Sequence, residues 1–324
     1  MSHQICSVHR PIFLVGPTAS GKTAMAVALA ERLNGEILSA DSMQIYQGMK
    51  IGTAAPSESE QKGIPHHLIG VIPPSESFSV ERYRSAALPI VRDILARGKT
   101  AIVAGGTGLY FDALLLSDSY APVEPDLAYR AKLNALAEEQ GVEAVHRLLA
   151  ACDPEAAARL HPNNLKRVIR ALEVYRLTGA SILEHDRLSH REPPEFQPVW
   201  LGIAPASRED LYARIDQRVD RMIEQGLVNE LRTLLANGLS IQSTAMQAIG
   251  YKELIPVVSA QCSLEAAVEE IKKRSRNYAK RQLTWFRRNP SIHWLLYQTS
   301  DLFSDLMDDA MQYLCSQLQS TEMP

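Results

Sequence analysis

GPTASGKT, residues 16–23, matches the pattern G-x-x-x-x-G-K-[ST] at every fixed position. An apolar run, IFLV at 12–15, precedes it, and an alanine-rich run with helical character follows over 23–33. In such a stretch the glycines let backbone N–H groups turn toward an anion, and the positive end of the following helix adds to the attraction. The sequence therefore predicts a phosphate-binding loop between a strand and a helix. It leaves open whether the phosphates belong to a nucleotide or to another molecule.

Every residue of this loop is a candidate phosphate contact. Lys22 supplies a point charge, and Thr23 offers a hydroxyl to Mg²⁺, which is the cofactor that we expect. The predicted phosphate-binding residues are Gly16, Pro17, Thr18, Ala19, Ser20, Gly21, Lys22 and Thr23.

Apolar runs and helical runs alternate in the first third of the chain. The runs at 12–15, 36–40 and 100–104 have the texture of buried strands, and those at 23–33 and 80–97 have the texture of helices. Such alternation is typical of βαβ units. We therefore expect an α/β fold with a P-loop NTPase-like parallel sheet core, helices on both faces of the sheet, and a helical insertion domain.

The insertion is indicated by a change of texture near Tyr120. From there to Pro198 the pattern is almost wholly helical, and strand texture returns at VWLGIA, residues 199–204. The predicted catalytic core is thus 1–120 together with 199–324, and the predicted insertion is 121–198. Residues 292–297 have the texture of a last strand and 301–318 that of a closing helix.

Composition narrows the class of protein. Hydrophobic residues make up 46% and charged residues 22% of the chain, and no apolar run approaches the ~18 residues that a membrane-spanning helix needs. The amino terminus lacks the pattern of a secretory signal, so we expect a cytoplasmic protein without a membrane partner. The four cysteines are far apart and form no CxxC pair, which predicts free thiols rather than a zinc site.

Two polar residues follow predicted strands. Asp41 comes directly after the strand at 36–40, and Thr107 follows the strand at 100–104, which offers no acid of its own. The carboxyl ends of the strands of an open α/β sheet form its ligand crevice. We therefore expect Asp41, Thr107 and the phosphate-binding loop to converge on one site, although either residue alone is also a common turn or cap residue.

A strongly basic stretch lies near the carboxyl end. Residues 271–288, IKKRSRNYAKRQLTWFRR, contain eight lysines or arginines and no acid, although the net charge of the chain is −3. On a helix, one face would carry Lys273, Arg276, Lys280 and Arg287, and another would carry Ile271, Tyr278 and Trp285. The first face suits nucleic-acid phosphates and the second suits packing, while a simply solvated face remains the alternative.

A third set of cations lies in the predicted helix that Ser207 opens. Arg214, Arg218 and Arg221 form a stripe at spacings of four and three, opposite an apolar stripe that includes Ile215 and Val219. By spacing alone, a solvated face paired with Asp216 and Asp220 is the simpler interpretation of these arginines.

Several motifs occur in an order that resembles one family. They are GPTASGKT, SADSMQIY, GTAAP, PHHLIG, VAGGTGLY, HPNNLKRVIRALEVY, IGY and AKRQLTWFRR. With these motifs the chain resembles the bacterial tRNA dimethylallyltransferases, also called tRNA isopentenyltransferases, from about residue 12 to residue 296.

The resemblance implies an activity. Members of that family transfer a dimethylallyl group from dimethylallyl diphosphate to N6 of adenine 37 in tRNAs that read codons beginning with U. The loop would then hold the diphosphate leaving group rather than a nucleoside triphosphate. The implied partners are the tRNA anticodon stem-loop and dimethylallyl diphosphate, and nothing in the sequence requires more than a monomer.

The resemblance also implies roles for single residues. Asp41 aligns with the general base, Thr107 with a residue near the reacting centre, and Arg218 with an arginine that reaches the diphosphate. The implied tRNA contacts are Asp41, Ser42, Met43, Gln44, Thr107, Arg130, Lys166, Arg167, Arg170, Gln247, Gly250, Tyr251, Lys252, Lys280, Arg281, Gln282, Trp285 and Arg287. Met246 and Gln247 depart from the Ile and Arg of some relatives, which weakens the prediction at Gln247.

Two other functions are compatible with the phosphate-binding loop. An adenylate isopentenyltransferase would prenylate free AMP or ADP, but a mononucleotide needs neither a helical insertion nor a basic helix. An ATP-dependent small-molecule kinase, or an ATP-dependent RNA-binding switch, would bind ATP through the same loop.

Overall fold

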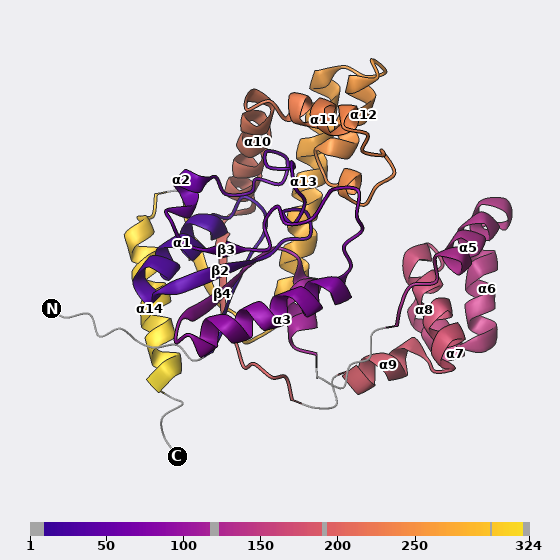
Figure 1. The fold of residues 1–324 in the computed structure, drawn as a ribbon, viewed down its shortest axis with the longest axis horizontal. Coiled ribbons are helices and arrows are strands. Elements are labelled where there is room, and N and C mark those ends of the chain that lie inside the picture. Colours follow the sequence, from indigo (N-terminus) through magenta and orange to yellow (C-terminus); the bar gives the residue numbers. More distant parts are fainter. Residues whose placement is uncertain (1–9, 117–122, 190–192, 299, 320–324) are drawn as a thin grey trace. The chain divides into compact units, whose positions relative to one another are not determined.

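The computed structural model describes residues 10–116, 123–189, 193–298 and 300–319 (Figure 1). The chain divides into two compact units. One comprises Met1–Leu114 and Phe196–Pro324, and the other comprises Leu115–Glu195. The boundary expected after residue 120 and the amino-terminal Cys6 lie outside the described residues.

The first unit is built on a six-stranded sheet in the order β3-β2-β4-β1-β5-β6, in which all pairs are parallel. At its centre Ile12 of β1 lies opposite Ile102 of β4 and Val199 of β5. Because every strand runs the same way, the carboxyl ends of β1, β2 and β4 lie at one edge. The strands are β1 (Ile12–Val15), β2 (Gly35–Ala40), β3 (His66–His67), β4 (Thr100–Gly105), β5 (Val199–Pro205) and β6 (His293–Tyr297).

Helices cover both faces of the sheet, as the sequence predicts. Successive side chains of β1 point to opposite faces. Ile12 and Leu14 join a core with α1 and α14, whereas Phe13 packs edge-on against Phe111 of α4 and Trp200 of β5. The prediction of a P-loop NTPase-like α/β core is therefore confirmed. The helices of this unit are α1 (Lys22–Leu33), α2 (Glu58–Gln61), α3 (Val80–Ala96), α4 (Gly108–Leu114), α10 (Arg208–Glu224), α11 (Leu227–Ala236), the short 3₁₀ helix η1 (Ala245–Gln247), α12 (Tyr251–Val258), α13 (Leu264–Phe286) and α14 (Phe303–Gln319).

The second unit consists of helices packed around their own core, in which Val145, Leu149 and Val168 are fully buried. Its central polar contact is the carboxylate of Glu173, which is also fully buried. Burial alone would raise the pKa of Glu173, but hydrogen bonds from Arg130 and Arg170 outweigh it and lower the pKa. The helices are α5 (Leu127–Gln140), α6 (Val142–Cys152), α7 (Pro154–Arg159), α8 (Leu165–Thr178) and α9 (Ile182–Ser189).

Three further expectations concern composition. None of the helices within the described residues is long and apolar enough to cross a bilayer. The described cysteines, Cys152, Cys262 and Cys315, are free thiols. In the same residues, no cluster of three or more His, Cys, Asp or Glu side chains could hold a metal ion.

A buried carboxylate anchors the other edge of the sheet. Glu36 of β2 is 3% exposed, and its oxygens accept hydrogen bonds from Arg97 (2.6 and 2.9 Å), Lys99 (2.7 Å) and His67 (2.9 Å). Its pKa is held well below the usual carboxyl value, chiefly by the Arg97 guanidinium. Glu36 thus ties β2, β3 and the start of β4 together.

Glu36→Gln should lower the free energy of unfolding by about 2–3 kcal/mol at neutral pH, because it removes the buried negative charge that accepts hydrogen bonds from the partly exposed side chains of Arg97, Lys99 and His67. The carboxylate stabilises the fold above the pKa of an unfolded glutamate, and this contribution is lost as the pH falls through the acid range. Urea unfolding between pH 7 and pH 4 measures both effects. The gap between wild type and Glu36→Gln should narrow toward pH 4, and a gap that stays constant would contradict this assignment.

Candidate active site

The phosphate-binding loop joins β1 to α1 at the carboxyl edge of the sheet. Gly16 approaches β5 so closely that a Cβ there would lie 2.3 Å from the carbonyl oxygen of Ile203. Gly21 has φ 86° as the N-cap of α1, a conformation that favours glycine. Ala19 also has a positive φ, 63°. Gly16 is therefore required because a Cβ would clash with β5, and Gly21 is required because of its backbone conformation.

Side chains from elements that are distant in the sequence form hydrogen bonds with the backbone of this loop. Arg214 of α10 donates to the carbonyl of Ala19 (3.0 Å), and Tyr297 of β6 donates to the carbonyl of Ser20 (3.0 Å). Gln282 of α13 accepts from the backbone N–H of Thr18 (2.8 Å). The loop is thus preorganised by α10, β6 and α13.

The inner side of the loop is left with unpaired donors. Among the described residues, none accepts a hydrogen bond from the backbone N–H groups of Ala19, Ser20 or Gly21. The hydroxyl of Ser20 is also buried without a partner within that part of the chain. Buried donors are costly when they are left unpaired. An anion in the loop would satisfy them.

Two cations add to this anion site. Lys22 donates to the carbonyl of Pro17 (2.6 Å); burial, with a smaller contribution from nearby Arg218, lowers the pKa of Lys22 to about 7. Burial likewise lowers the pKa of Arg218. In the described part of the chain no carboxylate lies within 4.0 Å of Arg218. Two neighbouring cations with lowered pKa values and no paired counter-ion are the expected environment of a bound polyanion.

Asp41 lies at the end of β2 with one oxygen fixed and the other free. Its Oδ1 accepts from the backbone N–H groups of Met43 (2.9 Å) and Gln44 (3.4 Å), which is a turn stabilised by the aspartate itself. Its Oδ2 has no hydrogen-bond partner among the described residues. Asp41 is near enough to Lys22 and Arg218 to favour their charged forms. The carboxylate is therefore oriented and available to a substrate.

Thr107 connects the ends of β4 and β2. Its N–H donates to the carbonyl of Ala40 (3.1 Å), and its Oγ1 accepts from the N–H of Ser42 (3.1 Å). Tyr278 of α13 also lies here; burial and then the charge of Asp41 raise the pKa of its hydroxyl, which bonds Thr107. The predicted convergence of Asp41, Thr107 and the phosphate-binding loop is thus present in the structure.

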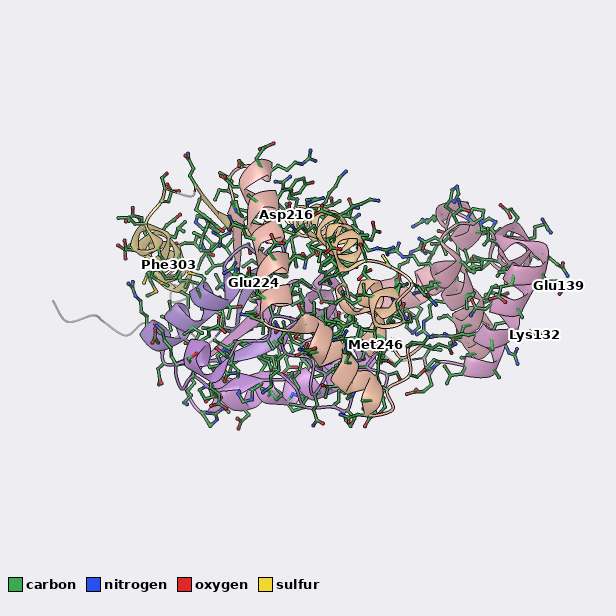
Figure 2. All side chains as sticks on the ribbon, turned by 90° about the horizontal axis from the view of Figure 1, so that it is seen from above. Lys132, Glu139, Asp216, Glu224, Met246 and Phe303 are labelled. Atoms are coloured by element: carbon green, nitrogen blue, oxygen red, sulfur yellow. The ribbon has the colours of Figure 1, made fainter. Side chains whose placement is uncertain are left out.

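Asp41, Tyr278 and Thr18 of the phosphate-binding loop line a pocket of about 260 Å³. Asp41, Thr18 and Arg218 contribute to its polar side. The apolar side includes residues of α10 and α13, two helices of the same unit, and also Met43, Ala248 and Ile249; Figure 2 labels Asp216 and Glu224 on α10. The apolar residues of α10 and α13 are Ile215, Val219, Met222 and Ile271. Arg218 is thus flanked on α10 by apolar side chains, so the pocket suits a ligand that is anionic at one end and hydrocarbon at the other.

The glycines of the VAGGTGLY motif are explained by α13. A Cβ at Gly106 would lie 2.0 Å from Nε2 of Gln282, and one at Gly108 would lie 2.2 Å from the ring of Trp285. Bare backbone is needed at both positions because α13 packs directly on this loop.

Some of the predicted RNA contacts of the core lie on its surface. The side chains of Lys280 and Arg281 on α13 and of Arg287, its C-cap, are exposed, as are those of Gln247 and Lys252, which are 3.2 Å apart. Arg281 also lines the pocket beside Tyr278.

Other residues of the core that were assigned to the RNA are used internally. Arg276 was expected on the phosphate-facing side of α13, but it forms an ion pair with Asp216 of α10 at 2.6 Å. Gln282 is 5% exposed, and Tyr251 is fully buried with its hydroxyl donating to Glu230 (2.5 Å). Gly250 is buried as well. The structure therefore gives these residues roles inside the protein.

Further assigned residues are partly engaged. Gln44 receives a hydrogen bond from Ser39 and donates to the carbonyls of Thr53 and Ala54. Ser42 and Met43 line the pocket. Trp285 is half-buried against Gly108.

In the second unit, Arg130 and Arg170 both bind the buried carboxylate of Glu173, whereas Lys166 and Arg167 are exposed on α8. The pairing of Arg130 was not predictable from spacing, because Glu173 is separated from it by 43 residues, whereas the i, i+3 spacing of Arg170 and Glu173 on α8 was an available signal. Arg214 and Tyr297 were not predicted as supports of the loop. For Arg214 the stripe on its helix was the available signal.

Comparisons with known proteins agree with this geometry. A family model described as IPP transferase matches residues 44–289, and one described as isopentenyl transferase matches residues 10–69. The chain is 44% identical to a tRNA dimethylallyltransferase of Caldanaerobacter subterraneus subsp. tengcongensis, over 95% of this chain and 98% of that protein. It is 46% identical to the protein of the same name from Geobacillus thermodenitrificans, over 95% and 97%.

Solved structures are similar as well. A tRNA isopentenylpyrophosphate transferase from Bacillus halodurans matches with a TM-score of 0.72 and 40% identity, covering 97% of this chain and 98% of that one. A eukaryotic dimethylallyltransferase acting on tRNA matches with a TM-score of 0.82 and 29% identity, covering 97% and 80%. The chain therefore belongs to the IPP transferase family, that of the tRNA dimethylallyltransferases.

Proposed function

We propose that this protein transfers a dimethylallyl group from dimethylallyl diphosphate to N6 of adenine 37 in tRNAs that read codons beginning with U. One observation carries the proposal. Thr18 of the phosphate-binding loop and Arg218 line the same pocket as Asp41, a carboxylate with a free oxygen, and the unpaired N–H donors of 19–21 and Lys22 directly follow Thr18 in the loop. This is the arrangement that an anionic leaving group and a weak amine nucleophile require.

The reaction breaks the bond between C1 of the dimethylallyl group and the diphosphate oxygen, and the bonding electrons leave with the diphosphate. The N–H groups of 19–21, Lys22 and Arg218 stabilise this growing charge. The lone pair of N6 forms the new C–N bond. Asp41 Oδ2 accepts the proton that N6 must lose, while Oδ1 stays bonded to the turn. Thr107 accepts a hydrogen bond from Ser42 in this turn and so helps to keep the carboxylate in its orientation.

The residues present also fit Mg²⁺ bound together with the diphosphate. Thr23 is exposed in the first turn of α1, and the described residues offer no cluster of acids that would hold the ion alone. Thr23 would therefore hold Mg²⁺ jointly with the diphosphate oxygens. The ion would supply positive charge that helps to neutralise the diphosphate.

Adenine must leave the anticodon loop to reach this pocket. Flipping a base out of a single-stranded loop costs on the order of a few kcal/mol. The apolar side chains of α10 and α13 would receive the hydrocarbon, and the exposed cations of α13 and α8 would bind RNA phosphates.

The test is to incubate the purified protein with dimethylallyl diphosphate and unmodified tRNA, AMP or no acceptor, and to analyse the nucleosides by mass spectrometry. Dimethylallyladenosine in tRNA alone supports the proposal. Prenylated AMP would identify an adenylate isopentenyltransferase instead. Hydrolysis of ATP without any prenyl transfer would favour the kinase or switch.

The exposed cations of α13 lead to a separate prediction. Lys280→Ala combined with Arg287→Ala should weaken tRNA binding about ten- to a hundred-fold and reduce the slope of log affinity against log salt by about 1.5, because two phosphate contacts are lost. The Michaelis constant for dimethylallyl diphosphate should change less than about two-fold. Filter binding at several salt concentrations measures the slope.

Arg32→Ala is the matched control, since Arg32 is an exposed arginine in the last turn of α1, at the end of that helix opposite the phosphate-binding loop. An unchanged salt slope in the α13 double variant would show that this face does not bind RNA.

A further inference from the structure

The side chain of Gln282 connects two loops of the candidate active site. It lies on α13 with 5% of its surface exposed. Its Oε1 accepts from the N–H of Thr18 in the phosphate-binding loop (2.8 Å), and its Nε2 donates to the carbonyl of Gly106 after β4 (3.0 Å). One buried amide therefore bridges two backbone segments at the ends of β1 and β4.

The surroundings are shaped for this amide. Gly106 has no room for a Cβ, because that atom would lie 2.0 Å from Nε2 of Gln282. The contact needs an acceptor and a donor at the end of one side chain. Leucine supplies neither of them, and an ionised glutamate supplies only the acceptor.

Gln282 also determines which way the loop presents its donors. Its contact removes the N–H of Thr18 from the set that can face a ligand. Arg214 and Tyr297 hold the carbonyls of Ala19 and Ser20. With these groups fixed, the N–H groups of 19–21 remain for the anion.

The helix that supplies Gln282 has two other uses. Ile271, Ser275 and Tyr278 of α13 line the pocket, and Lys280 and Arg287 are exposed on either side of Gln282 in the sequence. The helix proposed to meet the RNA thus also supports the phosphate-binding loop.

We propose that Gln282 is a positioning residue for the diphosphate site and does not contact the tRNA. This inference rests on the proposed function. It assigns the basic helix α13 a direct role in orienting the prenyl donor, through the hydrogen bonds to Thr18 and Gly106.

The test uses two near-isosteric variants, Gln282→Leu and Gln282→Glu. Gln282→Leu should raise the Michaelis constant for dimethylallyl diphosphate about ten- to thirty-fold at every pH, because both bonds are lost, and leave the Michaelis constant for tRNA within about three-fold. Gln282→Glu should be similarly impaired at pH 8, because a carboxylate repels the Gly106 carbonyl. At pH 6 it should recover most of the loss, because burial beside the Gly106 carbonyl raises the pKa of this carboxyl from its usual value of about 4.3, and the protonated form both accepts and donates.

A purely structural lesion would not recover on acidification, so the pH profile distinguishes positioning from loss of fold. The inference is overturned if Gln282→Glu shows no recovery relative to Gln282→Leu, or if either variant changes the constant for tRNA instead. Calorimetric binding of inorganic diphosphate to the same proteins provides a readout without turnover. If the wild type binds diphosphate but prenylates nothing, the proposed function fails, while the effect of Gln282 on diphosphate binding can still be measured.

Discussion

Asp41→Asn should lower the single-turnover rate of dimethylallyl transfer by about a thousand-fold or more, at the upper end of what a positioned general base contributes. The affinity for tRNA should stay within about three-fold. The reason lies in the separate roles of the two oxygens. An asparagine oxygen can still accept from Met43 and Gln44, so the turn is kept, but the amide that replaces Oδ2 cannot accept a proton.

The experiment requires saturating tRNA and donor, with rapid quenching and mass analysis of the nucleoside. Asp93→Asn is the matched control, since Asp93 lies near the end of α3, pairs with Arg97 and does not line the pocket. An Asp41→Asn enzyme that retains a tenth or more of the wild-type rate would remove Asp41 from the role of base. Loss of tRNA binding without a change in the rate of bound complex would assign it to recognition instead.

The fold was predictable because it depends on local patterns. The apolar residues of β1, the glycines of the loop and the helical run after it are contiguous, and each favours the same βα unit. The convergence of Asp41 with the loop followed from the rule that ligands bind at the carboxyl ends of parallel strands.

The uses of individual cations and amides were not predictable in the same way. Helical spacing placed Arg276 on the basic side of α13, but whether that side meets water or another helix depends on how α10 packs, and there Asp216 takes the charge. For the same reason, the sequence could not show that Gln282 is buried while its neighbours on α13 are exposed. Its signal was indirect, in the glycine at position 106 that must leave room for it.

The same distinction applies to the second unit. The sequence pattern predicted that this segment is helical, but Arg130 and Arg170 were interpreted only as RNA contacts. Both turn toward Glu173, a charge that is buried only after the helices have packed. An arginine that binds a buried carboxylate in two places is held rigidly, so any contact it makes with RNA would be preorganised.

Lys22→Met should weaken the binding of dimethylallyl diphosphate about ten- to a hundred-fold at pH 7, as expected for the loss of a charge-assisted hydrogen bond. The wild type should also lose affinity as the pH rises. Because the pKa of Lys22 is about 7 in the free protein, the lysine must take up a proton to bind the anion at a pH above that value. The loss of affinity approaches about ten-fold for each further pH unit, until the pH reaches the pKa that Lys22 has in the complex, which the bound anion raises.

Isothermal titration with the donor between pH 6.5 and pH 9, in buffers of different ionisation enthalpy, measures the affinity and the protons taken up. Lys22→Met is its own control for the ionisation of the diphosphate, because that contribution remains in the variant and cancels in the difference. At pH 6.5 most of the lysine is already charged, so the difference in affinity between the two proteins should be largest there and shrink as the pH rises. If the two affinity curves run parallel across the whole range, the lysine does not change charge on binding, and the cation that holds the diphosphate must be sought in Arg218 alone.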